Sequence, residues 1–173
     1  MDKPEKKTNR RDFLFTASYT VGAVGVGSII WPLVHQMNPD KAQQALATTE
    51  VDVSQVEPGK SITVLWRGKP VFLKRRTQQE IAEARSVSIK DLPDPQKDEE
   101  RVKDGKDEWL VMLGVCTHLG CVPLKDKGDF NGWFCPCHGS HYDVSGRIRK
   151  GPAPKNMEIP KYEFVDSNII KIG

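Results

Sequence analysis

The sequence predicts a mainly β head domain that is tethered to a membrane by one N-terminal helix. Three observations lead to this prediction. A run without Asp, Glu, Lys or Arg covers residues 13–34, short alternating segments bounded by Pro and Gly follow it, and all four cysteines fall in a later stretch. A chain of 173 residues is expected to form one domain of ordinary size plus an appendage.

The charge balance and the local motifs argue against two functional classes, nucleic-acid binding and nucleophilic hydrolysis. The chain has 26 Lys plus Arg against 23 Asp plus Glu, a net charge of +3. Proteins that bind nucleic acid electrostatically carry a larger basic excess, so we expect no nucleic acid among the partners. Ser140 and His141 are adjacent, but no nucleophile elbow accompanies them, so nucleophilic hydrolysis is not indicated.

The uncharged run over 13–34 is long enough to cross a membrane. At about 1.5 Å per residue, a helix of this length spans the hydrocarbon core of a bilayer. A buried core helix is the alternative, but it would show a polar stripe, and this run is relieved only by small residues. Because basic residues outnumber acidic ones before the run, we expect a single-pass protein of the bacterial inner membrane with a cytoplasmic N-terminus and a periplasmic head.

The segment 9–14, Asn-Arg-Arg-Asp-Phe-Leu, looks like a twin-arginine export signal. A cleavable signal peptide is the competing interpretation, because Ala45-Leu46-Ala47 has the small-x-small pattern of a cleavage site. The long polar stretch before that pattern argues against cleavage, so we interpret residues 1–37 as a permanent anchor. Residues 38–50 are small and polar and are expected to form a flexible linker.

The head is expected to begin at residue 51. Apolar and β-branched clusters between turn residues predict strands over 51–53, 61–66, 71–73, 109–113, 158–165 and 168–172. Thr77-Gln78-Gln79-Glu80 forms a capping box that predicts a short helix to about Ala84. The stretch 94–108 is rich in acidic residues and is expected to be a solvated loop, and 114–156 is expected to be loop-rich.

Two segments each carry a cysteine and a histidine at metal-ligand spacing. Cys116 and His118 form C-x-H, Cys135 and His138 form C-x-x-H, and residues 119–134 separate the two pairs. In an extended loop, side chains two residues apart point the same way, so Cys116 and His118 can reach one site. Four such ligands suit zinc, or a two-iron, two-sulfur cluster in which histidines replace two cysteines on one iron.

The boxes Cys116-Thr117-His118-Leu119-Gly120-Cys121 and Cys135-Pro136-Cys137-His138-Gly139-Ser140 resemble the two motifs of Rieske iron–sulfur proteins. With the anchor, the linker, residues 76–81 and Gly151-Pro152-Ala153-Pro154, nearly the whole chain is similar to bacterial Rieske subunits of ubiquinol:cytochrome c oxidoreductase, respiratory complex III. The resemblance implies a Rieske-type antiparallel β-sandwich over 51–173, with a loop-rich cluster-binding subdomain at about 114–157.

The resemblance also implies the cofactor and the residues that hold it. One Rieske-type 2Fe-2S cluster is expected, bound on one iron by two cysteines and on the other by two histidines, namely Cys116 with Cys135 and His118 with His138. The other two cysteines, Cys121 and Cys137, are implied to form a disulfide, which requires an oxidising compartment.

Further residues match positions that surround the cluster in the family. Ser140 and Tyr142 are implied to donate hydrogen bonds to a bridging sulfide and to the Cys116 sulfur. A proline loop from Gly151 through Pro152 to Pro154 is implied to cover the cluster. Leu119 and Pro152 are implied to form an apolar tip that docks on partners.

The function implied by the resemblance is electron transfer within a membrane translocase. The chain would accept one electron and a coupled proton from ubiquinol at the cytochrome b quinol-oxidation site, through His138 and His118, and pass the electron to cytochrome c1 in a dimeric complex. Two neutral imidazoles in place of thiolates raise the potential of such a centre. His35 and His141 are expected to be structural or interfacial. The alternatives are a plastoquinol-oxidising complex and a membrane-tethered protein that binds a redox-inert metal.

Overall fold

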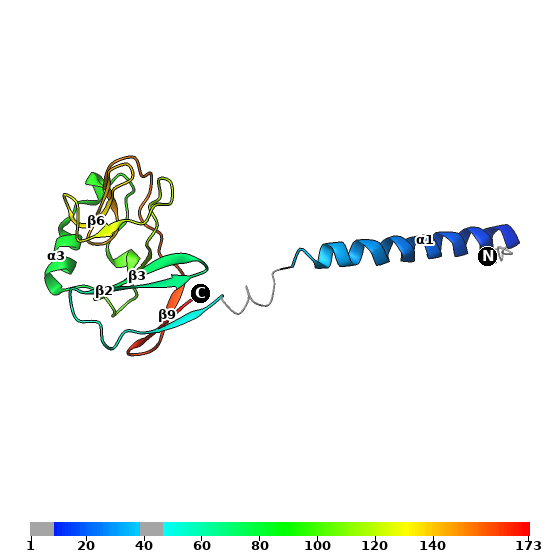
Figure 1. The fold of residues 1–173 in the computed structure, drawn as a ribbon, viewed down its shortest axis with the longest axis horizontal. Coiled ribbons are helices and arrows are strands. Elements are labelled where there is room, and N and C mark those ends of the chain that lie inside the picture. The colour runs from blue at the N-terminus through cyan, green and yellow to red at the C-terminus, as the bar shows by residue number, and fades with distance from the viewer. Residues whose placement is uncertain (1–8, 39–46) are drawn as a thin grey trace, which may run out of the picture. The chain divides into compact units, whose positions relative to one another are not determined.

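The computed structural model describes residues 9–38 and 47–173, which divide into a helical unit and a head domain (Figure 1). Helix α1 spans Arg10–His35, and none of its residues is buried. By length and composition it is apolar enough to cross a membrane, and it contains the predicted span over 13–34. Residues 1–8 of the predicted basic flank and residues 39–46 of the predicted linker over 38–50 lie outside the described residues. The last two residues of that predicted linker, Thr49 and Glu50, belong to strand β1, Thr49–Asp52.

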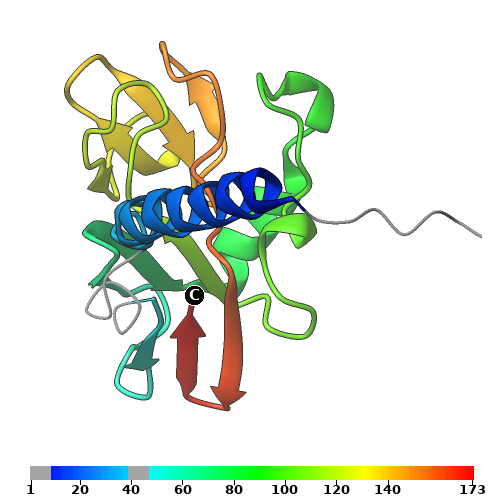
Figure 2. The ribbon, with the colours of Figure 1, turned by 90° about the vertical axis from the view of Figure 1, so that its right-hand side faces the viewer.

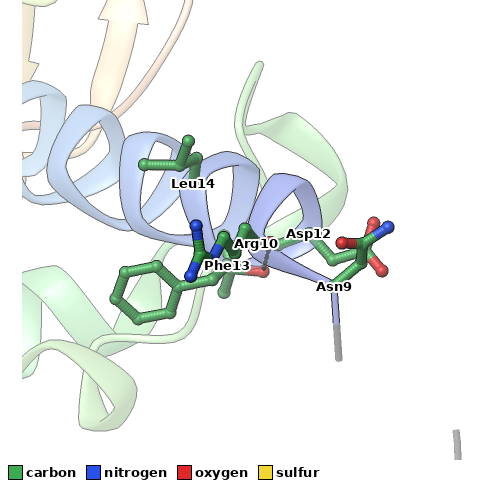
Figure 3. A pocket seen from close by; sticks show the side chains of 6 residues that line it. Asn9, Arg10, Asp12, Phe13 and Leu14 are labelled. Atoms are coloured by element: carbon green, nitrogen blue, oxygen red, sulfur yellow. Dashed lines mark hydrogen bonds between the residues drawn. The ribbon is translucent and has the colours of Figure 1, made fainter. Parts of the chain in front are cut away.

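The segment that looks like an export signal forms the N-terminal turns of α1. Figure 3 shows the side chains of Asn9, Arg10, Asp12, Phe13 and Leu14 around these turns. Asn9 is the N-cap residue, and Asp12 lies in the first turn, where a carboxylate is favoured by the helix dipole. The twin-arginine pair is therefore part of the helix and not of a separate extended segment.

The head consists of three antiparallel sheets. The first has the strand order β1–β10–β9, the second β2–β3–β4 and the third β5–β6–β7–β8. Figure 2 shows the third sheet, in yellow and orange, at the opposite end of the head from β9 and β10, in red. The strand bounds are β1 Thr49–Asp52, β2 Ser61–Trp66, β3 Lys69–Arg75, β4 Trp109–Leu113, β5 Leu124–Lys125, β6 Asn131–Cys135, β7 Ser140–Asp143, β8 Ile148–Lys150, β9 Tyr162–Asp166 and β10 Ile169–Ile172.

The second sheet forms the middle layer, because its two faces belong to different core clusters. In β4, Val111 and Leu113 pack with buried residues of β1 and β10, whereas Leu110 and Met112 pack with Trp133 and other residues of the third sheet. Successive side chains of a strand point to opposite faces, so a strand that is covered on both faces is apolar throughout. This explains why all five residues of β4 are buried.

The predicted capping-box helix is confirmed as α3, Gln78–Ser86. Thr77 caps it, since the Thr77 hydroxyl accepts from the backbone N–H of Glu80 and the Glu80 carboxylate accepts from the backbone N–H of Thr77. Two short 3-10 helices follow, η1 Ile89–Asp91 and η2 Glu99–Arg101. The strands predicted over 61–66 and 109–113 have the bounds of β2 and β4.

The prediction of a solvated loop over 94–108 is wrong at its charged centre. Asp98 and Arg101 are buried, and the Asp98 carboxylate lies 2.6 Å from the guanidinium of Arg76, with both side chains fully excluded from solvent. Ser145 donates a further hydrogen bond to Asp98, 2.6 Å long. Burial is tolerated because these charges are paired and hydrogen-bonded, and the net charge of the stretch does not reveal such partners.

The interpretation of 114–156 as loop-rich overlooked the third sheet, whose four strands all lie within it. These strands are only two to five residues long, and their pairing is interrupted by bulges near Asn131 and His141. Such short segments do not show a clear alternation of apolar and polar residues. At the edges of the head, β1 begins at Thr49, before the predicted start, and β9 begins at Tyr162 rather than at Glu158.

Candidate metal centre

Two loops bring the predicted cysteines and histidines together. The first follows β4 and carries Cys116 and His118. The second joins β6 to β7, begins at Cys135, the last residue of β6, and carries His138. Each loop turns back on itself through a glycine with positive φ, Gly120 in the first and Gly139 in the second. Their backbone N–H groups donate to the carbonyl oxygens of Cys116 and Cys135, at 2.9 and 3.0 Å. Glycine suits both positions because it has no Cβ to oppose a positive φ.

The two histidine rings meet across these loops. Their centroids are 4.6 Å apart and the ring planes are nearly perpendicular. The Nδ1 atom of His118 is buried and has no hydrogen-bond partner within residues 9–38 and 47–173. A buried polar atom without a partner costs free energy, so this nitrogen fits a position that a metal ion would satisfy.

The two cysteines of the predicted ligand set are buried thiols. Burial raises the pKa of Cys116, but hydrogen bonds from the Tyr142 hydroxyl and the backbone of His118 lower it more, so the net pKa lies below its ordinary value. Burial also raises the pKa of Cys135, and the adjacent Cys116 thiol adds to this rise. Cys116 is therefore the thiol that loses its proton more readily, and the thiolate is the form that binds metals.

The predicted disulfide is confirmed. Cys121 and Cys137 are bonded to each other, one from each loop, and their Cα atoms are 6.7 Å apart. The sulfur atoms of Cys121, Cys135 and Cys137 lie within 4.8 Å of one another. Because two of these three sulfurs are joined in the disulfide, this trio does not offer three thiolates to a metal. The bond instead links the two loops that carry the remaining donors.

Of the two predicted hydroxyl donors, Tyr142 is found at the Cys116 sulfur, and the donation of Ser140 to a bridging sulfide stays a prediction. The Tyr142 hydroxyl is buried and donates a 3.2 Å hydrogen bond to Cys116 Sγ. Burial, followed by its contact with Cys116, raises the pKa of Tyr142, so this phenol keeps its proton for that bond. Ser140 is also buried, and its Oγ accepts from the backbone N–H of Ala153 at 3.2 Å. Its own hydroxyl proton contributes to lowering the Cys116 pKa.

The predicted proline loop packs against the second loop. A Cβ at Gly151, where φ is +104°, would come 2.5 Å from the carbonyl oxygen of Gly139, so only glycine allows this close approach. Ala153 is buried beneath, while Pro152 and Pro154 are exposed. Leu119 is 71% exposed beside His118. The arrangement is compatible with the predicted docking tip, which stays a prediction.

Sequence reasoning missed one residue of the site and placed another correctly outside it. Thr117, between two predicted ligands, donates its backbone N–H to the Tyr142 hydroxyl at 3.2 Å and its own hydroxyl to the carbonyl oxygen of Lys155 at 2.6 Å. A threonine in a loop gives no local signal of such contacts. His141 accepts from the backbone N–H of Asp129 and packs on Phe134, which is a structural role.

Known proteins match both parts of the chain. Residues 47–163 match the family described as Rieske [2Fe-2S] domain, and residues 1–40 match the family described as Ubiquitinol-cytochrome C reductase Fe-S subunit TAT signal. The second match agrees with the twin-arginine-like segment over 9–14. Together with α1, it fits a membrane-anchored bacterial protein.

Similar proteins cover almost the full length. The chain is 57% identical over 175 residues to the ubiquinol-cytochrome c reductase iron-sulfur subunit of Rhodospirillum rubrum, covering 98% of this chain and 94% of the relative. It is 52% identical over 172 residues to the protein of the same name from Rickettsia prowazekii, covering 99% and 97%. A solved chain of a hyperthermophilic respiratory complex III is similar with a TM-score of 0.54 and 31% identity, covering 90% of this chain and 97% of that chain.

Proposed function

Since this chain belongs to the family of ubiquinol-cytochrome c reductase iron–sulfur subunits, we propose that its head carries electrons from ubiquinol at cytochrome b to cytochrome c1. The expected β fold and 2Fe-2S cofactor are confirmed by the Rieske [2Fe-2S] match. Relatives at 52% and 57% identity are named for ubiquinol, which favours it over plastoquinol as the donor.

We assign the cluster ligands as Cys116 and Cys135 on one iron and His118 and His138 on the other. The observation that carries this assignment is the contact of the two imidazole rings, together with the unpartnered Nδ1 of His118. Two buried thiols on the same two loops complete the set. When bound, the cluster supplies a one-electron acceptor whose potential is raised by its imidazole ligands.

The two histidines are proposed to handle the proton that leaves the quinol. An imidazole that binds iron through one nitrogen keeps the other for hydrogen bonding. His138 is exposed and His118 is half-buried, so the free nitrogen of His138 is the more accessible acceptor. We therefore propose His138 as the main contact with the quinol hydroxyl and His118 as its neighbour.

The surrounding side chains set the polarity of the site. Cys116 and Cys135 are buried, so their sulfur atoms are kept away from water. Tyr142 donates a hydrogen bond to the Cys116 sulfur, which favours its electron-rich state. Leu119 and Pro152 are exposed apolar residues, and we propose that they dock on cytochrome b. In this proposal the head lies in the bacterial periplasm, the helix anchors it in the inner membrane, and the assembled complex is dimeric.

Electron paramagnetic resonance at low temperature tests the proposed function. Full-length protein, purified with its metal complement and reduced with ascorbate, is expected to give the signal of a reduced 2Fe-2S centre. His138→Ala is expected to abolish that signal, whereas the matched variant His141→Gln, at a histidine with a structural role, is expected to retain it. A silent spectrum in metal-replete protein would show that the site holds a redox-inert ion.

A further inference from the structure

Asn156 connects three parts of the head. It is 7% exposed, and its side chain and backbone make four hydrogen bonds. Its backbone N–H donates to the Asp94 carboxylate at 2.9 Å, and its amide nitrogen donates to the Asp94 carbonyl and to Gln96 Oε1 at 3.0 and 3.3 Å. Its amide oxygen accepts from the backbone N–H of Ile148 at 2.9 Å. Asn156 thus fastens the segment after the proline loop to β8 and to the charged stretch over 94–101, which we call the insertion.

The insertion holds this segment on the other side of Asn156 as well. The buried guanidinium of Arg101 donates to the carbonyl oxygen of Met157 at 2.7 Å. The same guanidinium donates to the carbonyl oxygen of Ser145, also at 2.7 Å. None of these insertion residues contacts a proposed cluster ligand. The insertion therefore acts on the site by positioning the segment around Asn156.

A continuous series of hydrogen bonds leads from this segment to the proposed ligand Cys116. The Lys155 carbonyl, next to Asn156, accepts from the Thr117 hydroxyl at 2.6 Å. The backbone N–H of Thr117 donates to the Tyr142 hydroxyl, and Tyr142 donates to Cys116 Sγ, both at 3.2 Å. The Thr117 hydroxyl also lies 3.3 Å from the Tyr142 hydroxyl, but its own proton goes to the Lys155 carbonyl. The single proton of Tyr142 is donated to the sulfur, while its oxygen is held in place by the Thr117 backbone N–H.

We propose that Asn156 is a positioning residue through which the insertion over 94–101 maintains the Tyr142 hydrogen bond to Cys116 and so tunes the potential of the site. The inference rests on the proposed ligand role of Cys116. The Lys155 side chain is exposed, so the place of its carbonyl is fixed by its bonded neighbour. When that neighbour loses its anchors, the carbonyl and Thr117 move away from Tyr142, and the phenol no longer directs its proton at the sulfur.

The test is a redox titration of full-length variants, with the cluster spectrum as the check that the cofactor is present. Asn156→Ala is expected to lower the midpoint potential by less than Tyr142→Phe does. In a Tyr142→Phe background, Asn156→Ala is expected to cause no further shift, because the bond that it acts through is already gone. In a Ser140→Ala background, the shift in potential caused by Asn156→Ala is expected to add to the shift caused by Ser140→Ala, because the two residues act through different hydrogen bonds. Lys155→Ala is the matched control, since it leaves the carbonyl in place and is expected to keep the wild-type potential.

A second variant and a second readout keep the inference open to refutation. Asn156→Asp keeps the acceptor for Ile148 and the backbone donation to the Asp94 carboxylate, but it loses the amide donations to the Asp94 carbonyl and to Gln96. It therefore provides the test where Asn156→Ala does not fold. Hydrogen exchange in peptides over 116–120 is expected to rise in both variants and not in Lys155→Ala. An unchanged potential with an intact cluster spectrum, or full additivity with Tyr142→Phe, overturns the inference. A wild-type protein without any cluster spectrum overturns the proposed function instead.

Discussion

Removing the Tyr142 hydroxyl is expected to lower the reduction potential of the proposed cluster. In Tyr142→Phe the ring still fills its fully buried place, but Cys116 Sγ loses the 3.2 Å hydrogen bond that favours the reduced, electron-rich state. A hydrogen bond to a more negatively charged acceptor is stronger by about 1 kcal/mol, which we take as the difference between the reduced and the oxidised state. Since about 1.4 kcal/mol corresponds to about 59 mV for one electron, the expected fall is about 40 mV. The backbone N–H of Thr117 also loses its acceptor, which costs about 1 kcal/mol of stability.

The assay is a potentiometric titration of full-length protein, followed by electron paramagnetic resonance. Tyr162→Phe is a suitable control, because Tyr162 is also buried but belongs to the core cluster between the first and second sheets. It is expected to leave the potential unchanged. A wild-type potential in Tyr142→Phe, or an equal fall in both variants, would refute the proposed effect of the hydroxyl on the sulfur.

Three further predictions concern the frame around the site. Replacing Cys121 and Cys137 together by serine removes a link between residues 16 positions apart. The double variant is expected to lose about 3 kcal/mol of unfolding free energy in a denaturant titration and to hold less cluster. An unchanged denaturant midpoint would contradict this. Asp98→Asn leaves the buried Arg76 without its carboxylate and is expected to cost about 3–5 kcal/mol at neutral pH. Burial raises the pKa of Asp98, but the hydrogen bond and charge of Arg76 lower it more, so this stabilisation is full above the unfolded pKa of about 4 and is lost as pH falls through the lower folded pKa. Unfolding measured against pH should therefore show the cost of Asp98→Asn shrinking in acid, and a constant cost would argue against the pairing. Proline substitutions over 42–45, outside the described residues, are expected to slow quinol oxidation by the assembled complex with an unaltered cluster spectrum, and undiminished turnover would contradict a mobile tether.

Local signals predicted much of the fold. The uncharged run over 13–34 lies within α1, the capping box at Thr77 begins α3, and the apolar run over 109–113 forms β4. Each of these patterns is contained in a few consecutive residues. Such patterns depend on helix capping, hydrophobic length and burial, which neighbouring residues largely determine.

Features that depend on distant partners were not predicted. Asp98 can be buried because it accepts hydrogen bonds from Arg76 and Ser145, which are 22 and 47 residues away in the sequence. No property of the acidic stretch itself indicates these partners. The third sheet was overlooked for a similar reason, since its short strands are stabilised by pairing with one another and by packing on the middle sheet.

The candidate site was predicted from a resemblance more than from physical patterns. Spacing alone left zinc and an iron–sulfur cluster as alternatives for Cys116, His118, Cys135 and His138. The structure adds information that the spacing of these residues does not give, such as the buried Nδ1 of His118 that has no hydrogen-bond partner among the described residues. It also adds the link from Asn156 through Thr117 to Tyr142, which joins segments far apart in the sequence.

A redox titration of the full-length protein across pH tests most directly whether imidazoles on a redox-active iron couple electron and proton transfer. Oxidised iron withdraws electron density from its ligands, so uptake of an electron and uptake of a proton at the site are expected to favour each other. The midpoint potential should then be constant at low pH and fall as pH rises into the alkaline range. A potential that does not change with pH, or the absence of a reversible couple, would contradict the proposed histidine ligation.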